Sequence, residues 1–81
     1  MTGKRNEIRF VPGQLERLRK SYRMTRNLFA KQVGTTSYQV KLWELGEVVP
    51  GTKKLVKMCN RFDVEPNYFF NTKVIREKFT H

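Results

Sequence analysis

The stretch FAKQVGTTSYQVKLWE, residues 29–44, decides the fold of this chain. Gly34 can take the left-handed conformation that ends a helix, and Thr36 then offers a hydroxyl that caps the next one. Gln39, three residues after Thr36, can return a side-chain hydrogen bond in the reciprocal arrangement called a capping box. The side chains expected to point inward are Phe29, Ala30, Val33 and Val40. We therefore expect two short helices, about 26–33 and 37–45, with the second presented outward by the first.

The second of these helices carries side chains that packing alone does not require. The outward set comprises Ser37, Tyr38, Gln39, Lys41 and Leu42. A stable surface helix rarely needs tyrosine and leucine on its solvent-facing side, so this set predicts a binding face. Two positions have alternative interpretations: Gln39 is either occupied in the capping box or available to a ligand, and Tyr38 either meets a ligand or packs against Leu42.

Apolar spacing and breaker residues outline the remaining elements. They predict a helix at about 12–22 beginning at Pro12, a fourth helix with Leu55, Met58, Cys59 and Phe62 on one face, and a brief helical turn after Pro66. Residues 1–10 are expected to form a loosely held basic arm that can acquire an edge contact. Residues 71–81 are ambiguous between helix, strand and fraying tail. The domain proper is thus expected to span residues 11–70.

Composition restricts the class of partner. The chain has 81 residues with 17 Lys and Arg against 7 Asp and Glu, a formal net charge of +10. This surplus favours an anionic partner, for which nucleic acid and anionic membrane both qualify. No apolar stretch approaches the roughly 20 residues that span a bilayer, and no signal peptide is recognisable. We expect an intracellular, cytoplasmic protein.

Metal, redox and enzymatic chemistry find little support in the sequence. One cysteine and one histidine cannot build an internal disulfide or a zinc site. Cys59 falls on an apolar helix face and is expected to be a small core residue. Ser37, Cys59 and His81 have no base or orienting carboxylate predicted beside them. We expect no enzymatic activity, no cofactor and no small-molecule substrate.

These residues resemble the lambda-repressor-like helix-turn-helix regulators, also called the XRE or Cro/cI type, and the module of phage and mobile-element repressors. The similarity covers about residues 10–70. The matching positions are Leu15, Leu18, Arg19, Met24, Thr25, Phe29, Ala30, Gly34, Val40, Trp43, Glu44, Gly46, Pro50, Leu55, Phe62 and Val64. The resemblance implies an all-α, compact five-helix domain that binds double-stranded DNA, with its third helix in the major groove.

The resemblance also implies roles for single residues. The outward set of the third helix matches the base-reading face, and Arg19 and Glu44 match an internal ion pair. The positions expected to contact DNA phosphates are Arg26, Asn27, Thr36, Lys53 and Lys54. Arg26 stands where the family usually has glutamine. Arginine can also hold a phosphate, so the phosphate role is retained, but the usual hydrogen bond between the second and third helices is in question. Lys53 and Lys54 either contact phosphate or form an ordinary solvated basic turn.

The function expected from the resemblance is a sequence-specific transcriptional regulator, a repressor binding an inverted repeat as a homodimer. Candidate dimer residues are Leu45, Val48, Val49, Val74, Ile75 and Phe79. An alternative is an antitoxin or anti-repressor that mainly holds a partner protein, such as a toxin or peptidase. We expect the protein to lie with the nucleoid of a bacterial or phage-infected cell. The sequence shows neither the stacking aromatics on an exposed sheet that are typical of RNA binding nor the basic amphipathic helix that is typical of membrane binding.

Overall fold

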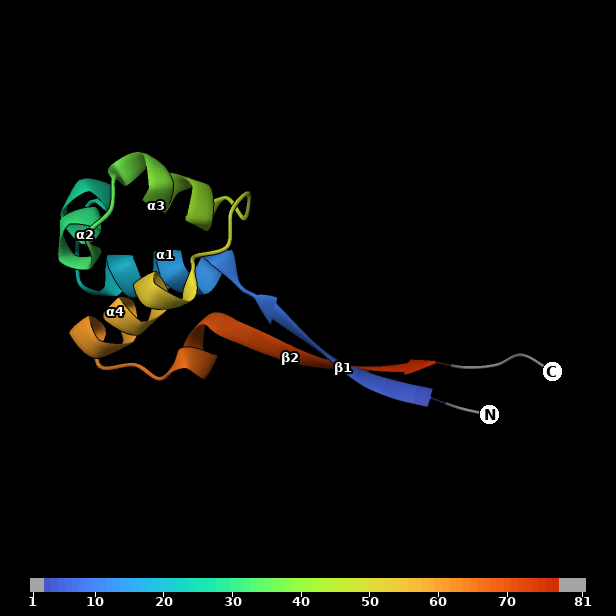
Figure 1. The fold of residues 1–81 in the computed structure, drawn as a ribbon. Coiled ribbons are helices and arrows are strands. Elements are labelled where there is room, and N and C mark those ends of the chain that lie inside the picture. Colours follow the sequence, from blue (N-terminus) through green and yellow to red (C-terminus); the bar gives the residue numbers. More distant parts are fainter. Residues whose placement is uncertain (1–2, 78–81) are drawn as a thin grey trace.

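The computed structural model describes the backbone of residues 3–77 and the side chains of residues 8–71, and in this part the chain is mostly helical. The elements in chain order are β1 (Gly3–Phe10), α1 (Pro12–Ser21), α2 (Arg26–Val33), α3 (Ser37–Glu44), α4 (Thr52–Phe62), the 3-10 helix η1 (Pro66–Phe69) and β2 (Phe70–Glu77). The helices form a rounded body, and β1 and β2 project from it together (Figure 1). This projection makes the molecule elongated, with extents of 55 × 23 × 21 Å.

The ends of the helices follow from local chemistry. Pro12 stands in the first turn of α1, where its missing N–H costs no hydrogen bond. Thr25 caps α2 by accepting a hydrogen bond at Oγ1 from the backbone N–H of Leu28, at 3.1 Å. Asp63 ends α4 in the left-handed conformation, with φ of 54°. These three boundaries therefore coincide with residues suited to start or stop a helix.

The core lies between the helices and is closed by η1. Its fully or almost fully buried apolar side chains are Leu15, Leu18, Phe29, Ala30, Val33, Val40, Trp43, Met58, Phe62 and Phe69. The rings of Phe29 and Phe62 stack almost parallel with their centroids 5.1 Å apart, which joins α2 to α4. Burial of these side chains is the main favourable contribution to folding and holds the helices in place.

The two ends of the described chain pair with one another, and we call the β1–β2 pair the terminal ribbon. Its strands are antiparallel, in a register that runs from Phe10 opposite Phe70 to Gly3 opposite Glu77. The Phe10 and Phe70 rings meet edge to face, 6.0 Å apart, and both pack partly against the core. Beyond them the terminal ribbon leaves the body without a further layer beside it (Figure 1).

These strands correct the predicted fold class. A mostly helical domain is confirmed, and the count of five helices is not, because the described residues form four α-helices and one 3-10 helix. The all-α description is wrong, because a two-stranded sheet accompanies them. Residues 3–10 of the expected basic arm form strand β1, which makes an edge contact with β2, and β2 continues to Glu77. The physical reason is that Phe10 and Phe70 pack on the same core, which aligns the chain on either side of them for pairing.

We expect Phe29→Ala to lower the free energy of unfolding by about 3 to 5 kcal/mol, because it leaves a cavity where a fully buried ring stacks on Phe62. Leu28→Ala, at the neighbouring side chain that is 43% exposed, should cost less than about 1 kcal/mol. Urea denaturation followed by circular dichroism measures both. Equal losses in the two variants would contradict the assignment of the core.

Candidate nucleic-acid interface

The bend between α2 and α3 has the geometry that the sequence predicts. Gly34 ends α2 in the left-handed conformation, with φ of 70° and ψ of 46°. Thr36 Oγ1 accepts a hydrogen bond from the backbone N–H of Gln39 at 3.1 Å, which caps α3. The cap leaves the start of α3, with its outward-directed N–H groups, at the surface. Such a helix start favours an anion such as a phosphate.

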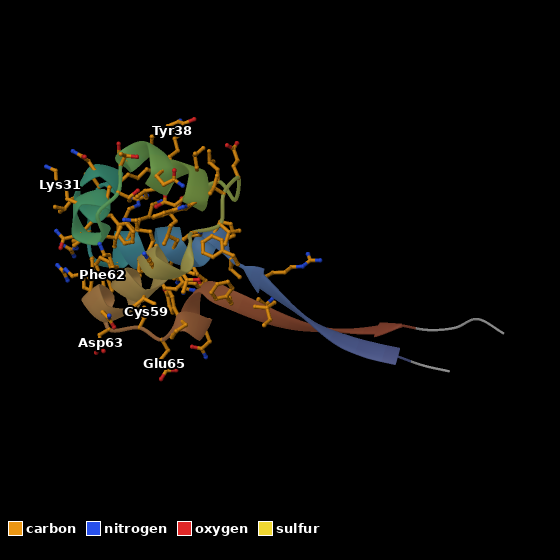
Figure 2. All side chains as sticks on the ribbon, in the orientation of Figure 1. Lys31, Tyr38, Cys59, Phe62, Asp63 and Glu65 are labelled. Atoms are coloured by element: carbon orange, nitrogen blue, oxygen red, sulfur yellow. The ribbon has the colours of Figure 1, made fainter. Side chains whose placement is uncertain are left out.

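The outward set of α3 divides from its buried set as expected. Val40 and Trp43 are buried beneath the helix, whereas Ser37 and Lys41 are exposed and Leu42 is half-buried. Tyr38 remains 65% exposed and extends from the outer side of α3, away from the body (Figure 2). Packing against Leu42 would cover more of the ring, so the structure favours a tyrosine that is accessible to a ligand.

Gln39 is half-buried, but its side-chain amide makes no hydrogen bond within the part of the chain that the structure describes. Only its backbone N–H takes part in the cap, so the reciprocal half of the predicted capping box is not formed. The amide therefore keeps its two donors and its acceptor for another partner.

Glu44 holds the far end of α3 to the body through two arginines. Arg19 Nε donates to Glu44 Oε2 at 2.7 Å and Arg19 Nη2 donates to Oε1 at 3.1 Å, a bidentate pair between α1 and α3. Arg19 also donates through Nη1 to the carbonyl of Met24, at 2.9 Å. The internal ion pair implied by the family resemblance is confirmed, and it joins three segments of the chain.

Arg26 adds a contact that sequence reasoning missed. Its Nε donates to Glu44 Oε1 at 3.0 Å, so the first residue of α2 is tied to the end of α3. This ion pair links the two helices at the position where the family's usual glutamine link was in question. The Arg26 side chain is still 37% exposed, which leaves its outer N–H groups at the surface. No local signal in the sequence marks this contact, in which Glu44 Oε1 accepts hydrogen bonds from both Arg19 and Arg26.

The two lysines at the start of α4 differ. Lys54 Nζ donates to the carbonyl of Gly34 at 2.6 Å, which gives the C-terminal end of α2 a cation. Lys53 is exposed and makes no hydrogen bond or ion pair within the described residues. A cation is unfavourable at the start of α4, but Lys54 gains a favourable contact with the C-terminal end of α2. The first turn of α4 lies beside the bend that precedes α3.

The other predicted positions are dispersed. Asn27 and Thr36 are exposed at the starts of α2 and α3. Leu45, Val48 and Val49 are 56%, 38% and 58% exposed after α3. The backbone of Val74 and Ile75 lies in β2, but their side chains, and the whole of Phe79, lie outside the described residues.

The remaining chemical groups show no second site. Burial raises the pKa of the Cys59 thiol, which disfavours the reactive thiolate. Among the side chains that the structure describes, no three His, Cys, Asp or Glu gather closely enough to hold a metal ion. None of the helices described is long and apolar enough to cross a membrane.

Comparison with known proteins agrees with this geometry. A family model described as a helix-turn-helix domain matches residues 14–75, so the chain belongs to that family and is a lambda-repressor-like domain of the DNA-binding kind. Among solved structures, the chain is similar to the P22 c2 repressor in a crystal structure with a synthetic operator, at 20% identity and a TM-score of 0.70. The similarity covers 75% of this chain and 92% of the repressor chain. A search of curated proteins gives no match.

We expect Glu44→Ala to destabilise the fold by about 3 to 5 kcal/mol, because it leaves the buried Arg19 without a counter-ion. As a control, Glu16→Ala removes one partner of an exposed pair with Lys20 and should cost no more than about 1 kcal/mol. Thermal unfolding of the two variants measures the difference. If Glu44→Ala has the same melting temperature as the native protein, Glu44 does not hold α3 in place.

Proposed function

We propose that this chain is a sequence-specific regulator of transcription, acting as a repressor, that binds double-stranded DNA through α3 in the major groove. The observation that carries the proposal is the outer face of α3, where Ser37, Tyr38 and Lys41 are exposed beside the half-buried Gln39 and Leu42. Val40 and Trp43 fix the inner face of the helix. A major groove admits a helix presented in this way. The P22 c2 repressor, which shares the fold, was crystallised in complex with a synthetic operator, and this supports a DNA ligand here.

Base recognition is assigned to the outward set. The unbonded amide of Gln39 can form a bidentate pair with adenine, and Lys41 can reach the acceptors of guanine. Leu42, half-buried and beside them, suits the methyl group of thymine. Ser37 and Tyr38 complete the face at the start of the helix, where the groove is nearest.

Phosphate anchoring is assigned to residues around this face. Arg26 uses Nε for Glu44, so its other N–H groups can bind a phosphate without giving up the ion pair. Lys54 similarly uses one of three ammonium donors for Gly34. Lys53, Asn27 and Thr36 are exposed nearby. Such contacts position the protein but do not discriminate between sequences.

Two copies are needed for useful specificity, because one module reads only a few base pairs. We therefore infer a homodimer on an inverted repeat whose half-sites are separated by roughly one helical turn. Its place of action is the nucleoid of a bacterial or phage-infected cell. The exposed Leu45, Val48 and Val49 and the β2 segment with Val74 and Ile75 are the candidate contact regions.

A second role, as an antitoxin or anti-repressor that holds a partner protein, is favoured by one observation. The terminal ribbon projects away from the body on a side other than the outer face of α3 (Figure 1). A partner could therefore occupy it while α3 holds DNA. Co-purification of a stoichiometric partner would separate this role from repression alone.

We expect Gln39→Ala to bind its operator and unrelated duplexes with similar affinities, because it removes a contact to a base. In contrast, Lys53→Ala should weaken all duplexes alike and reduce the slope of log affinity against log salt by about 1. Fluorescence anisotropy at several salt concentrations measures both, on an operator found by footprinting upstream of the coding region.

The control for the charge change is Lys20→Ala, which removes one positive charge from α1, where Lys20 pairs with Glu16. It should leave the salt dependence close to that of the native protein. The proposal would be overturned by equal affinity of the native protein for every duplex across the salt series, or by unchanged amide shifts of residues 37–42 on adding the operator.

A further inference from the structure

Two uncovered features lie on the same side of the molecule. One is the loop after α3, which we call the loop patch and define by Leu45, Glu47, Val48 and Val49. The other is the terminal ribbon, which leaves the body below that loop (Figure 1). The loop contacts the start of α1, because a Cβ added at Gly46 would lie 3.1 Å from Cγ of Pro12, and Pro12 follows the end of β1 by two residues.

The loop patch is both apolar and acidic. Its three apolar side chains are between 38% and 58% exposed, and Glu47 among them is exposed as well. The loop is nevertheless ordered, because the backbone N–H groups of Glu47 and Val48 donate to the carbonyl of Leu42 at 3.0 and 3.4 Å. An ordered cluster of uncovered apolar side chains is typical of a surface that another protein covers.

The terminal ribbon has complementary properties. Its basic residues are Lys4, Arg5, Arg9, Lys73 and Arg76, against the two acidic residues Glu7 and Glu77. Ile8 is 68% exposed, and the register places it on the same face as the Phe10–Phe70 pair and the Val74 position. Apolar positions therefore continue for a short way outward from the core on this face, which ends with the basic pair Lys4 and Arg76. An isolated two-stranded ribbon is only marginally stable in water, so a covering partner would stabilise it.

We propose that the terminal ribbon of one copy covers the loop patch of a second copy, and that the contact is exchanged reciprocally within a two-fold dimer. This inference rests on the homodimer of the proposed function and specifies how its copies meet. Apolar positions meet apolar side chains, and the basic strands meet Glu47. A reciprocal contact of this kind closes on itself and limits assembly to two copies.

Charge selects the loop patch over the alternatives. Direct pairing of two terminal ribbons brings together surfaces of the same positive sign, which is unfavourable. Asp63 and Glu65 are also exposed, but they lie on the lower side of the body, away from the loop after α3 (Figure 2). The large exposed side chain beside Asp63 is Tyr22, whose hydroxyl donates to the carbonyl of Phe62, whereas three exposed aliphatic side chains accompany Glu47. Glu47 is the acidic group of the described body that lies within an exposed apolar cluster.

Two variants with opposite charge changes test the contact. One carries Glu47→Lys in the loop patch. The other carries Arg76→Glu in the terminal ribbon, a position on the same face as Ile8 whose register partner is Lys4, so no like-charged pair arises within the sheet. Each variant alone should dissociate about tenfold more readily, because its contacts oppose like charges. In an equimolar mixture, every contact of the mixed dimer again joins opposite charges, so association should recover.

Sedimentation equilibrium without DNA measures the three samples, with Glu65→Lys as a control that should leave the dimer intact. Failure of the mixture to recover, or native association of either variant alone, would overturn the inference. Tighter association of the Arg76→Glu variant would instead indicate contact between the ribbons themselves, and would also overturn it. Amide shifts of residues 37–42 on a half-site duplex report separately on DNA binding, which should persist in all variants if only the dimer contact is lost.

Discussion

The carboxylate of Glu44, shared between Arg19 and Arg26, is the interaction on which the arrangement of the helices depends. It is fully buried, and each of its oxygens accepts at least one hydrogen bond from a guanidinium group. Desolvation of such charges offsets most of their attraction, so the cluster adds little net stability. Its effect is geometric, because a carboxylate in this place is tolerated only when α1 and α2 both present their arginines to the end of α3.

The other end of α3 is fixed by different means. Gly34 turns the chain, Thr36 caps the helix, and Lys54 reaches across from α4 to the carbonyl of Gly34. Between the two ends, Val40 and Trp43 hold the helix to the core. A short helix of this kind would have little stability alone, so its rigidity comes from these attachments. The outward set can therefore be presented in one orientation before any ligand arrives.

Local chemistry allowed the helices to be predicted, whereas contacts between distant segments could not be. Caps such as Thr25 and Thr36 act on residues three positions away, so their signals are contained in a short stretch of sequence. The hydrogen bonds from Arg26 to Glu44 and from Lys54 to Gly34 join residues far apart in the chain. The sequence contains many other lysines and arginines that could have donated to the same acceptors. Arg19 with Glu44 was accessible only through the family resemblance.

The terminal ribbon shows the same limit more strongly. A β-hairpin can be predicted from the turn residues between its strands, but here the whole helical body separates β1 from β2 in the sequence. Its strands also mix charged and apolar residues, as a loose arm and a frayed tail would. What brings them together is the shared packing of Phe10 and Phe70 on the core. That contact is a property of the folded body and has no counterpart in the neighbouring sequence.

This dependence has a consequence for the order of folding. Pairing the first and last strands closes nearly the entire chain into one loop, and the entropy lost in doing so is recovered only when the helices have already drawn the ends together. The helical body can form from contacts closer in sequence. The two strands can then pair progressively, starting at Phe10 and Phe70. We therefore expect the ribbon to assemble last and to open first. The orientation of α3, which is held by contacts within the helical body, should not change when the ribbon opens.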